Sequence, residues 1–250
     1  MVDALTYLPF VGGFFVATDL LPLSEARLLE TIERRQRMSY SIGASYRARR
    51  QWVGIPAQAL GRELVLPAAF ILAILVSNFA LASQPNVKLF DLLVFAAGFT
   101  LGFRRGALVA VGAWLVYGTF NPWGAAGPLL LATLMMSECL YAIAGAGMRL
   151  LVSPRQLSVL PGRWSLLLAA AALVATLAYD VVTNVYTGIV WAQMTGAFEY
   201  KRWVLTALFN PGALLFSAYH VGSNVVFFAL LGPALIRGAG RAKQALSWEA

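Results

Sequence analysis

The uneven distribution of positive charge between apolar segments is the feature that most constrains this chain. Six apolar segments, at 65–82, 89–103, 106–120, 127–152, 164–192 and 203–236, are interpreted as membrane-spanning helices. With these six spans, sixteen of the nineteen lysines and arginines fall on one side of the membrane. They are Arg27, Arg34, Arg35, Arg37, Arg47, Arg49, Arg50 and Arg62 before the first span, Arg104 and Arg105, then Arg149, Arg155 and Arg163, and finally Arg237, Arg241 and Lys243. The other side carries only Lys88, Lys201 and Arg202.

This sorting predicts the topology. Positive residues close to the ends of spans resist translocation, so the basic side is expected to be cytoplasmic. A backbone in hydrocarbon must satisfy its own hydrogen bonds, which favours helices over isolated strands. We therefore expect an all-α, multi-pass protein of the cell membrane, built as a bundle of six transmembrane helices with both termini in the cytoplasm.

Composition agrees with a membrane protein. Hydrophobic residues make up 60% of the chain and charged residues 12%, whereas a soluble domain has about 25% charged residues. The net charge of +8 could suggest nucleic acid, but the basic residues gather at the ends of spans, so anionic lipid headgroups are the expected partner and nucleic acid is not. Cys139 is the single cysteine, so neither a disulfide framework nor a cysteine metal cluster is predicted, and no cofactor is expected.

The chain is expected to have three parts, at 1–63, 64–243 and 244–250. The first contains an apolar stretch at 4–23, which either crosses the membrane or lies in its interface, and a basic helix that begins at Ser24. This helix is interpreted either as amphipathic and bound to the inner leaflet or as a solvated linker. The second part is the membrane domain, and the third is a short cytoplasmic tail.

Several short motifs in the membrane domain resemble one transporter family. They are Pro-Asn-Val at 85–87, Gly-Phe-Thr-Leu-Gly-Phe-Arg-Arg-Gly at 98–106, Asn-Pro-Trp-Gly at 121–124, Gly-Ala-Gly-Met-Arg at 145–149, and polar patches at 180–184 and 220–224. Their order over roughly residues 64–243 is similar to that in the substrate-binding S component of energy-coupling factor (ECF) transporters. The basic N-terminal segment departs from the family, many members of which begin almost directly with the first span.

The resemblance implies a function and partners. S components capture a vitamin or related micronutrient from outside and deliver it through a transmembrane coupling subunit driven by two ATPase subunits. The chain has no G-x-x-x-x-G-K-[ST] phosphate loop, and we expect a binding subunit rather than an enzyme. The family docks through small residues with A-x-x-x-A spacing on the first span, which Ala69 and Ala73 match and Ser77 extends. Internal packing is the alternative role for this strip.

Polar side chains inside three of the predicted spans are the candidate substrate site. Ionisable residues are costly in a membrane and usually face an interior or a wet cavity. The candidates are Glu138, Asp180, Asn184, His220 and Asn224, with Trp123 and Tyr186 as aromatic rings that could stack on a flat heterocycle. Asp91, near the outer start of the second span, is expected simply to face water.

Three alternatives remain open on the sequence alone. The polar residues could form an interhelical network that only fixes the bundle. The protein could be an intramembrane enzyme that uses Asp180, Glu138 and His220 as acid–base groups, although no H-E-x-x-H or G-x-S-x-G motif is present. It could also be a stand-alone small-solute carrier, a class in which inverted repeats are common but none is evident here. Neighbouring genes for ATPases and a coupling subunit would favour the S component.

Overall fold

The structure is a computed structural model that describes residues 57–158, 162–196 and 198–246. Every element below belongs to one compact unit, Ile55–Ala250. The predicted apolar stretch at 4–23 and the basic helix beginning at Ser24 lie outside the described residues.

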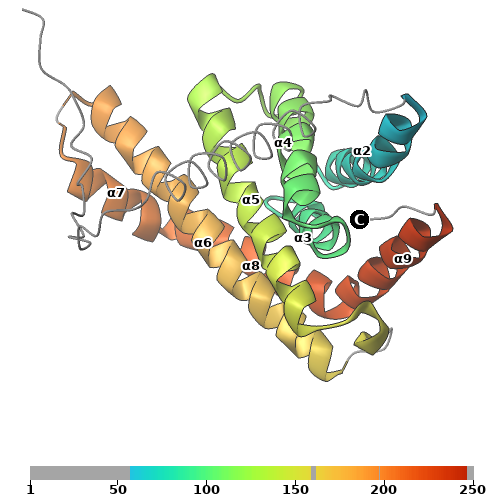
Figure 1. Ribbon diagram of the computed structural model, residues 1–250. Coiled ribbons are helices and arrows are strands. Elements are labelled where there is room, and N and C mark those ends of the chain that lie inside the picture. The colour runs from blue at the N-terminus through green and yellow to red at the C-terminus, as the bar shows by residue number, and fades with distance from the viewer. Residues whose placement is uncertain (1–56, 159–161, 197, 247–250) are drawn as a thin grey trace, which may run out of the picture. The chain divides into compact units, whose positions relative to one another are not determined.

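Within the described ranges the chain forms eight α-helices, one 3₁₀ turn and no strand, which confirms the all-helical prediction (Figure 1). Four helices are long and apolar enough to cross a membrane, namely α2 over Glu63–Ala80, α5, α6 and α8. The elements are α2 (Ala57–Ala80), α3 (Phe90–Leu101), α4 (Phe103–Thr119), α5 (Pro128–Leu151), η1 (Pro154–Gln156), α6 (Arg163–Met194), α7 (Tyr200–Phe209), α8 (Pro211–Leu230) and α9 (Gly232–Ala245).

Helix α3 is the centre of this unit. All twelve of its residues are buried, and it contacts α2, α4, α5, α8 and α9. A helix that is apolar on every side is stable only when neighbours cover every side. At a rise of about 1.5 Å per residue, α3 is about 18 Å long, against about 30 Å for a bilayer's hydrocarbon core. Thus α3 is shorter than a full span, and its two ends lie within the protein.

Small residues allow the central helices to approach closely. A Cβ atom built on Gly98 of α3 would collide with the carbonyl of Ala142, and one built on Gly145 of α5 would collide with the carbonyl of Phe95. These two glycines therefore serve helix packing. Gly102 has a different role. Its φ of +88° interrupts the helical backbone between α3 and α4, and this conformation favours glycine.

The prediction of one continuous span over 203–236 is wrong. The segment is broken into α7, α8 and the start of α9. At the first break the Asn210 side chain accepts a hydrogen bond from the Ala213 N–H at 2.9 Å and Pro211 occupies the first turn of α8, a combination that begins a helix. At the second break Pro233 lies in the first turn of α9, which has no capping side-chain hydrogen bond. The membrane-length helix of this segment is α8, with 20 residues.

Candidate functional site

A cavity of about 630 Å³ lies at the end of the unit where α3 begins. Its walls come from the α2–α3 connection and from α2, α4, α5, α6 and α8. The residues that carry its chemistry are Asn78, Lys88, Trp114, Tyr179, Asp180 and Asn184. Asn86 braces the α2–α3 connection, because its Nδ2 donates a hydrogen bond to the Phe216 carbonyl of α8 at 3.1 Å.

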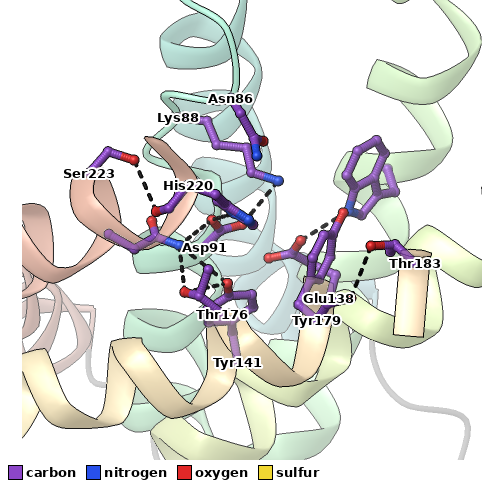
Figure 2. A network of polar contacts seen from close by, with 12 residues as sticks. Asn86, Lys88, Asp91, Glu138, Tyr141, Thr176, Tyr179, Thr183, His220 and Ser223 are labelled. Atoms are coloured by element: carbon purple, nitrogen blue, oxygen red, sulfur yellow. Dashed lines mark hydrogen bonds and ion pairs between the residues drawn. The ribbon is translucent and has the colours of Figure 1, made fainter. Parts of the chain in front are cut away.

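Beneath the cavity, His220 of α8 lies between two carboxylates, and Figure 2 shows it beside one of them, Asp91. Its Nδ1 is 2.7 Å from Oδ1 of Asp180 on α6, and its Nε2 is 2.8 Å from Oδ2 of Asp91 on α3. His220 and Asp91 are completely buried, and Asp180 is buried apart from the edge that lines the cavity. The three side chains join three helices that are far apart in the sequence.

Hydrogen-bond chemistry determines the proton content of this cluster. An ionised carboxylate can only accept a hydrogen bond, so both ring nitrogens need a proton unless one carboxyl carries it. The cluster therefore holds one proton more than a neutral imidazole and two carboxylates would. Imidazole is more basic than a carboxylate in water, and on that ground we assign the proton to His220, which is then an imidazolium between two anions.

Lys88 adds a second cation beside the same anions. Its Nζ is 3.4 Å from Oδ1 of Asp91, and it lies over the rings of Tyr179 and Trp114, at 4.8 Å and 5.5 Å from their centroids. Burial of Lys88 disfavours its charge, but the attraction of Asp91 and other nearby acidic groups prevails and raises the pKa of the ammonium above its ordinary value. Lys88 is thus a charged group in a cavity walled partly by aromatic rings.

Asn224 completes the buried side of the cluster. Its Nδ2 donates to Oδ2 of Asp91 at 2.7 Å and to the hydroxyl of Thr176 at 2.9 Å, and it lies 3.2 Å from the hydroxyl of Tyr141. The Tyr141 hydroxyl in turn donates to Thr176 at 2.9 Å. The network therefore extends from the cavity into the core, across α3, α5, α6 and α8.

Glu138 of α5 is a further buried carboxyl group, close enough to Asp91 and Lys88 to interact with both. Its Oε2 accepts a hydrogen bond from Trp114 Nε1 at 3.1 Å, and the side chain is fully buried. Because the Trp114 ring forms part of the cavity wall, Glu138 holds that ring in place and does not reach the cavity surface itself. Glu138 therefore influences the cavity only through the position of the Trp114 ring.

The structure places the predicted site residues in three groups. Asp180, Asn184 and Trp123 line the cavity, and Trp123 is 79% exposed at its mouth. Glu138, His220 and Asn224 are buried beside it. Tyr186 does not line it, because it is six residues after Asp180 and so points to another side of α6, whereas Thr183, Asn184 and Thr187 share the face of Asp180.

The expectation that Asp91 faces water is wrong. Its side chain is fully buried, and it binds His220, Asn224 and Lys88. Position at the start of a helix suggested exposure, but the α2–α3 connection covers that helix end. Lys88 was not predicted as a site residue, because from the sequence it was only one of three basic residues on the outer side. The three-residue spacing between Lys88 and Asp91 at the start of a helix is the signal that could have found the pair.

Two buried oxygen atoms at the cavity have no hydrogen-bond partner among the described residues. They are Oδ1 of Asn78 and Oδ2 of Asp180, and both residues line the cavity. A buried acceptor without a partner costs about 1–3 kcal/mol, and more when it is charged. Both oxygens are buried behind the cavity wall, so a donor inside the cavity reaches them only when the lining side chains shift. In the described part of the chain, no group of three or more His, Cys, Asp or Glu side chains could hold a metal ion.

The predicted docking strip lies on α2, away from this site. Ala69 and Ala73 are exposed, and Ser77 is half-buried with its hydroxyl bonded to the Ile74 carbonyl at 3.0 Å. The two alanines therefore do not pack against the other described helices. Internal packing within the described residues does not explain this strip.

Comparisons of the chain with protein-family models, with curated proteins and with solved structures find no match.

The buried charge cluster predicts a specific stability pattern. Asp91→Asn leaves the two cations Lys88 and His220 without their shared anion, and breaking a buried ion pair costs about 3–5 kcal/mol. We expect a clearly lower melting temperature in detergent, partly restored in the Lys88→Met/Asp91→Asn double variant. Glu199→Gln, which removes an exposed partner of Arg202, serves as the control and should melt close to the wild type. If Asp91→Asn melted at the wild-type temperature, this result would contradict the buried charge cluster.

Proposed function

We propose that this protein is the substrate-binding subunit of a membrane transporter, similar to the S component of ECF systems, and that it captures a small polar molecule in the 630 Å³ cavity. The observation that carries the proposal is the cavity with Asp180 and Lys88 on its surface and the buried Asp91–His220 pair beneath. With the buried Glu138 there are five ionisable groups in one apolar bundle, which is expensive, and interhelical polar contacts contribute only about 0.6 kcal/mol each on average. Fixing the bundle is therefore a weak reason to keep them.

The proposed orientation places the cavity on the outside. It opens at the end of the unit that contains the α2–α3 and α4–α5 connections, which the charge sorting assigns to the outer face. We propose six membrane-embedded segments, with α3 and α4 as short members shielded by their neighbours, and both termini in the cytoplasm. Four apolar helices of membrane length support this arrangement.

The surface of the cavity indicates the chemistry of the ligand. Oδ2 of Asp180 and Oδ1 of Asn78 require hydrogen-bond donors, and the ammonium of Lys88 offers a donor and a positive charge. Trp114, Tyr117 and Tyr179 provide aromatic walls, on which flat rings can stack. We infer a compact molecule with an aromatic or heterocyclic ring, N–H donors on one edge and an acceptor on another. Many vitamins and related micronutrients have this combination.

No specific observation favours the intramembrane enzyme. His220 has no exposed surface, and both of its ring nitrogens are engaged with carboxylates. Glu138 is bonded to Trp114 and is buried. These groups do not converge on one reacting position in the cavity.

Substitution of Asp180 tests the binding site. Asp180→Asn keeps the volume of the side chain and removes its charge, so a charge-assisted hydrogen bond of about 1.5–3 kcal/mol is lost and affinity falls about ten- to hundredfold. The measurement is native mass spectrometry of the small molecule that copurifies with the full-length protein, followed by calorimetry with that molecule. Glu199→Gln is the control for loss of a carboxylate outside the cavity. If folded Asp180→Asn retained the small molecule as well as the wild type does, Asp180 would not be a substrate-binding residue.

Thiol labelling tests the orientation. In a Cys139→Ser background, a cysteine at Asn121 should react with an impermeant reagent added to intact cells, because Asn121 lies at the cavity end of the unit. A cysteine at Arg155 should react only after the membrane is opened. The reverse labelling pattern would show the opposite orientation and would contradict the proposal that the cavity receives substrate from outside.

Bulky substitutions on α2 test the coupling partner. Ala73→Trp fills a position where close approach of another helix leaves no room. We expect loss of copurification with the coupling subunit and loss of uptake, while the copurified small molecule is retained. Ala68→Trp, an exposed alanine on a neighbouring face of the same helix, is the matched control.

Two results would separate the alternatives. If Ala73→Trp copurifies with the coupling subunit at normal yield, the strip is not the docking surface. If uptake persists in cells that lack the coupling subunit and the ATPases, the protein is a stand-alone carrier.

A further inference from the structure

A second cavity, of about 580 Å³, lies at the opposite end of α3 from the first. The last turn of α3 forms one wall, and the remaining walls come from the end of α5, from η1 and from α9. Five of its lining residues are cationic, and none of the described lining residues is acidic. The cations are Arg149, Arg155, Arg237, Arg241 and Lys243.

Backbone carbonyls hold three of these cations in place. Arg149 Nη1 and Lys243 Nζ both donate to the carbonyl of Thr100, at 3.2 Å and 3.3 Å. Arg237 Nη1 donates to the carbonyl of Leu157 at 3.0 Å. Thr100 lies in the last turn of α3, where the helix dipole favours cations. Capping of α3 thus accounts for the positions of Arg149 and Lys243, but it does not involve the other three.

Arg155 and Arg241 are the informative members of the cluster. Both side chains are exposed, line the cavity and make no hydrogen bond or ion pair with the described residues. They come from η1 and α9, so the fold gathers them beside the anchored cations from distant parts of the sequence. Like charges around one concave surface repel one another and create a strong positive potential within it. Partial burial and the neighbouring Arg149 and Arg105 lower the pKa of Lys243, as expected from such a potential.

The arrangement matches one ligand chemistry. Several arginine side chains that converge on a cavity offer planar, multi-donor recognition of phosphate oxygens. The cavity also lies at the end of the unit that the charge sorting assigns to the cytoplasm, where anionic phospholipids give the membrane surface a negative potential. A cavity of this volume exceeds what a single inorganic ion requires and can hold a phosphate with its ester substituent.

We propose that this cavity is a binding site for a phosphate group, carried either by an anionic phospholipid or by a soluble phosphate compound of the cytoplasm. The site is independent of the substrate cavity, from which the length of α3 separates it. Occupancy would bind α3, α5, η1 and α9 to one another through the anion.

Two measurements on the full-length protein in neutral detergent identify the source of the phosphate. Native mass spectrometry compares retention of phosphatidylglycerol with that of phosphatidylcholine of the same acyl chains. Thermal melting with inorganic phosphate, against chloride at equal ionic strength, measures the soluble source. The test variant is Arg155→Gln/Arg241→Gln, in which no described hydrogen bond of the fold is removed. The control is Arg104→Gln/Arg163→Gln, which removes two exposed arginines from the same end outside the cavity.

We expect selective retention of phosphatidylglycerol by the wild type and the control, and a loss of about tenfold or more in the cavity variant, since each basic residue near an anionic headgroup contributes several-fold to binding. If stabilisation by inorganic phosphate instead depends on Arg155 and Arg241 while the two lipids bind equally, the ligand is a soluble phosphate compound. Equal losses in the control and cavity variants, or no loss in either, would overturn the site.

Discussion

The hydrogen bonds that hold His220 between Asp91 and Asp180 are the interaction on which the rest of this structure depends. They join α8 to α3 and to α6, and they bring ionisable groups into a unit with a large hydrophobic core. Taking isolated charges out of water costs several kcal/mol for each ion after relaxation. The cluster offsets that cost because each anion faces a cation at hydrogen-bond distance and Asn224 satisfies Asp91 further. Loss of any one member leaves a partner charged and buried.

The same cluster shapes the substrate cavity. Asp180 uses one carboxylate oxygen for His220, and the other is buried next to the cavity without a hydrogen-bond partner. Lys88 is held over aromatic rings by Asp91. The groups available to a ligand are therefore positioned by buried partners that a ligand does not touch. Such preorganisation reduces the ordering that binding would otherwise require, and it links the stability of the bundle to the geometry of the site.

The helical class could be predicted from the sequence because hydrophobic length is a property of local segments. The position of Asp180 and Asn184 on one face of α6 also follows from local sequence, because they are four residues apart in a helix. Tertiary features could not be predicted from local pattern. Asp91 looks like a solvent-facing residue at the start of a helix until the α2–α3 connection covers it, and the role of Lys88 emerges only when α6 brings Tyr179 beside it.

Two further differences have local causes that hydropathy alone does not detect. The Asn210–Pro211 pair begins α8 and Pro233 lies in the first turn of α9, both within one apolar segment. These two breaks divide one predicted span among three helices. Tyr186 was grouped with the site as an aromatic ring that could stack on a ligand, but residue type does not fix the direction of a side chain around a helix axis. Glu138, predicted as a site residue, binds Trp114 and so supports the cavity wall from behind.

The state of His220 tests this account most directly, and the chain contains only one histidine. Protein labelled with ¹⁵N at histidine would give a single pair of ring-nitrogen signals in solid-state NMR of lipid-reconstituted samples. The account predicts that both nitrogens are protonated at neutral pH, as in an imidazolium bonded on both sides to carboxylates. A spectrum with one protonated and one unprotonated ring nitrogen would contradict the two-sided charge pairing from which the site and its stability are derived.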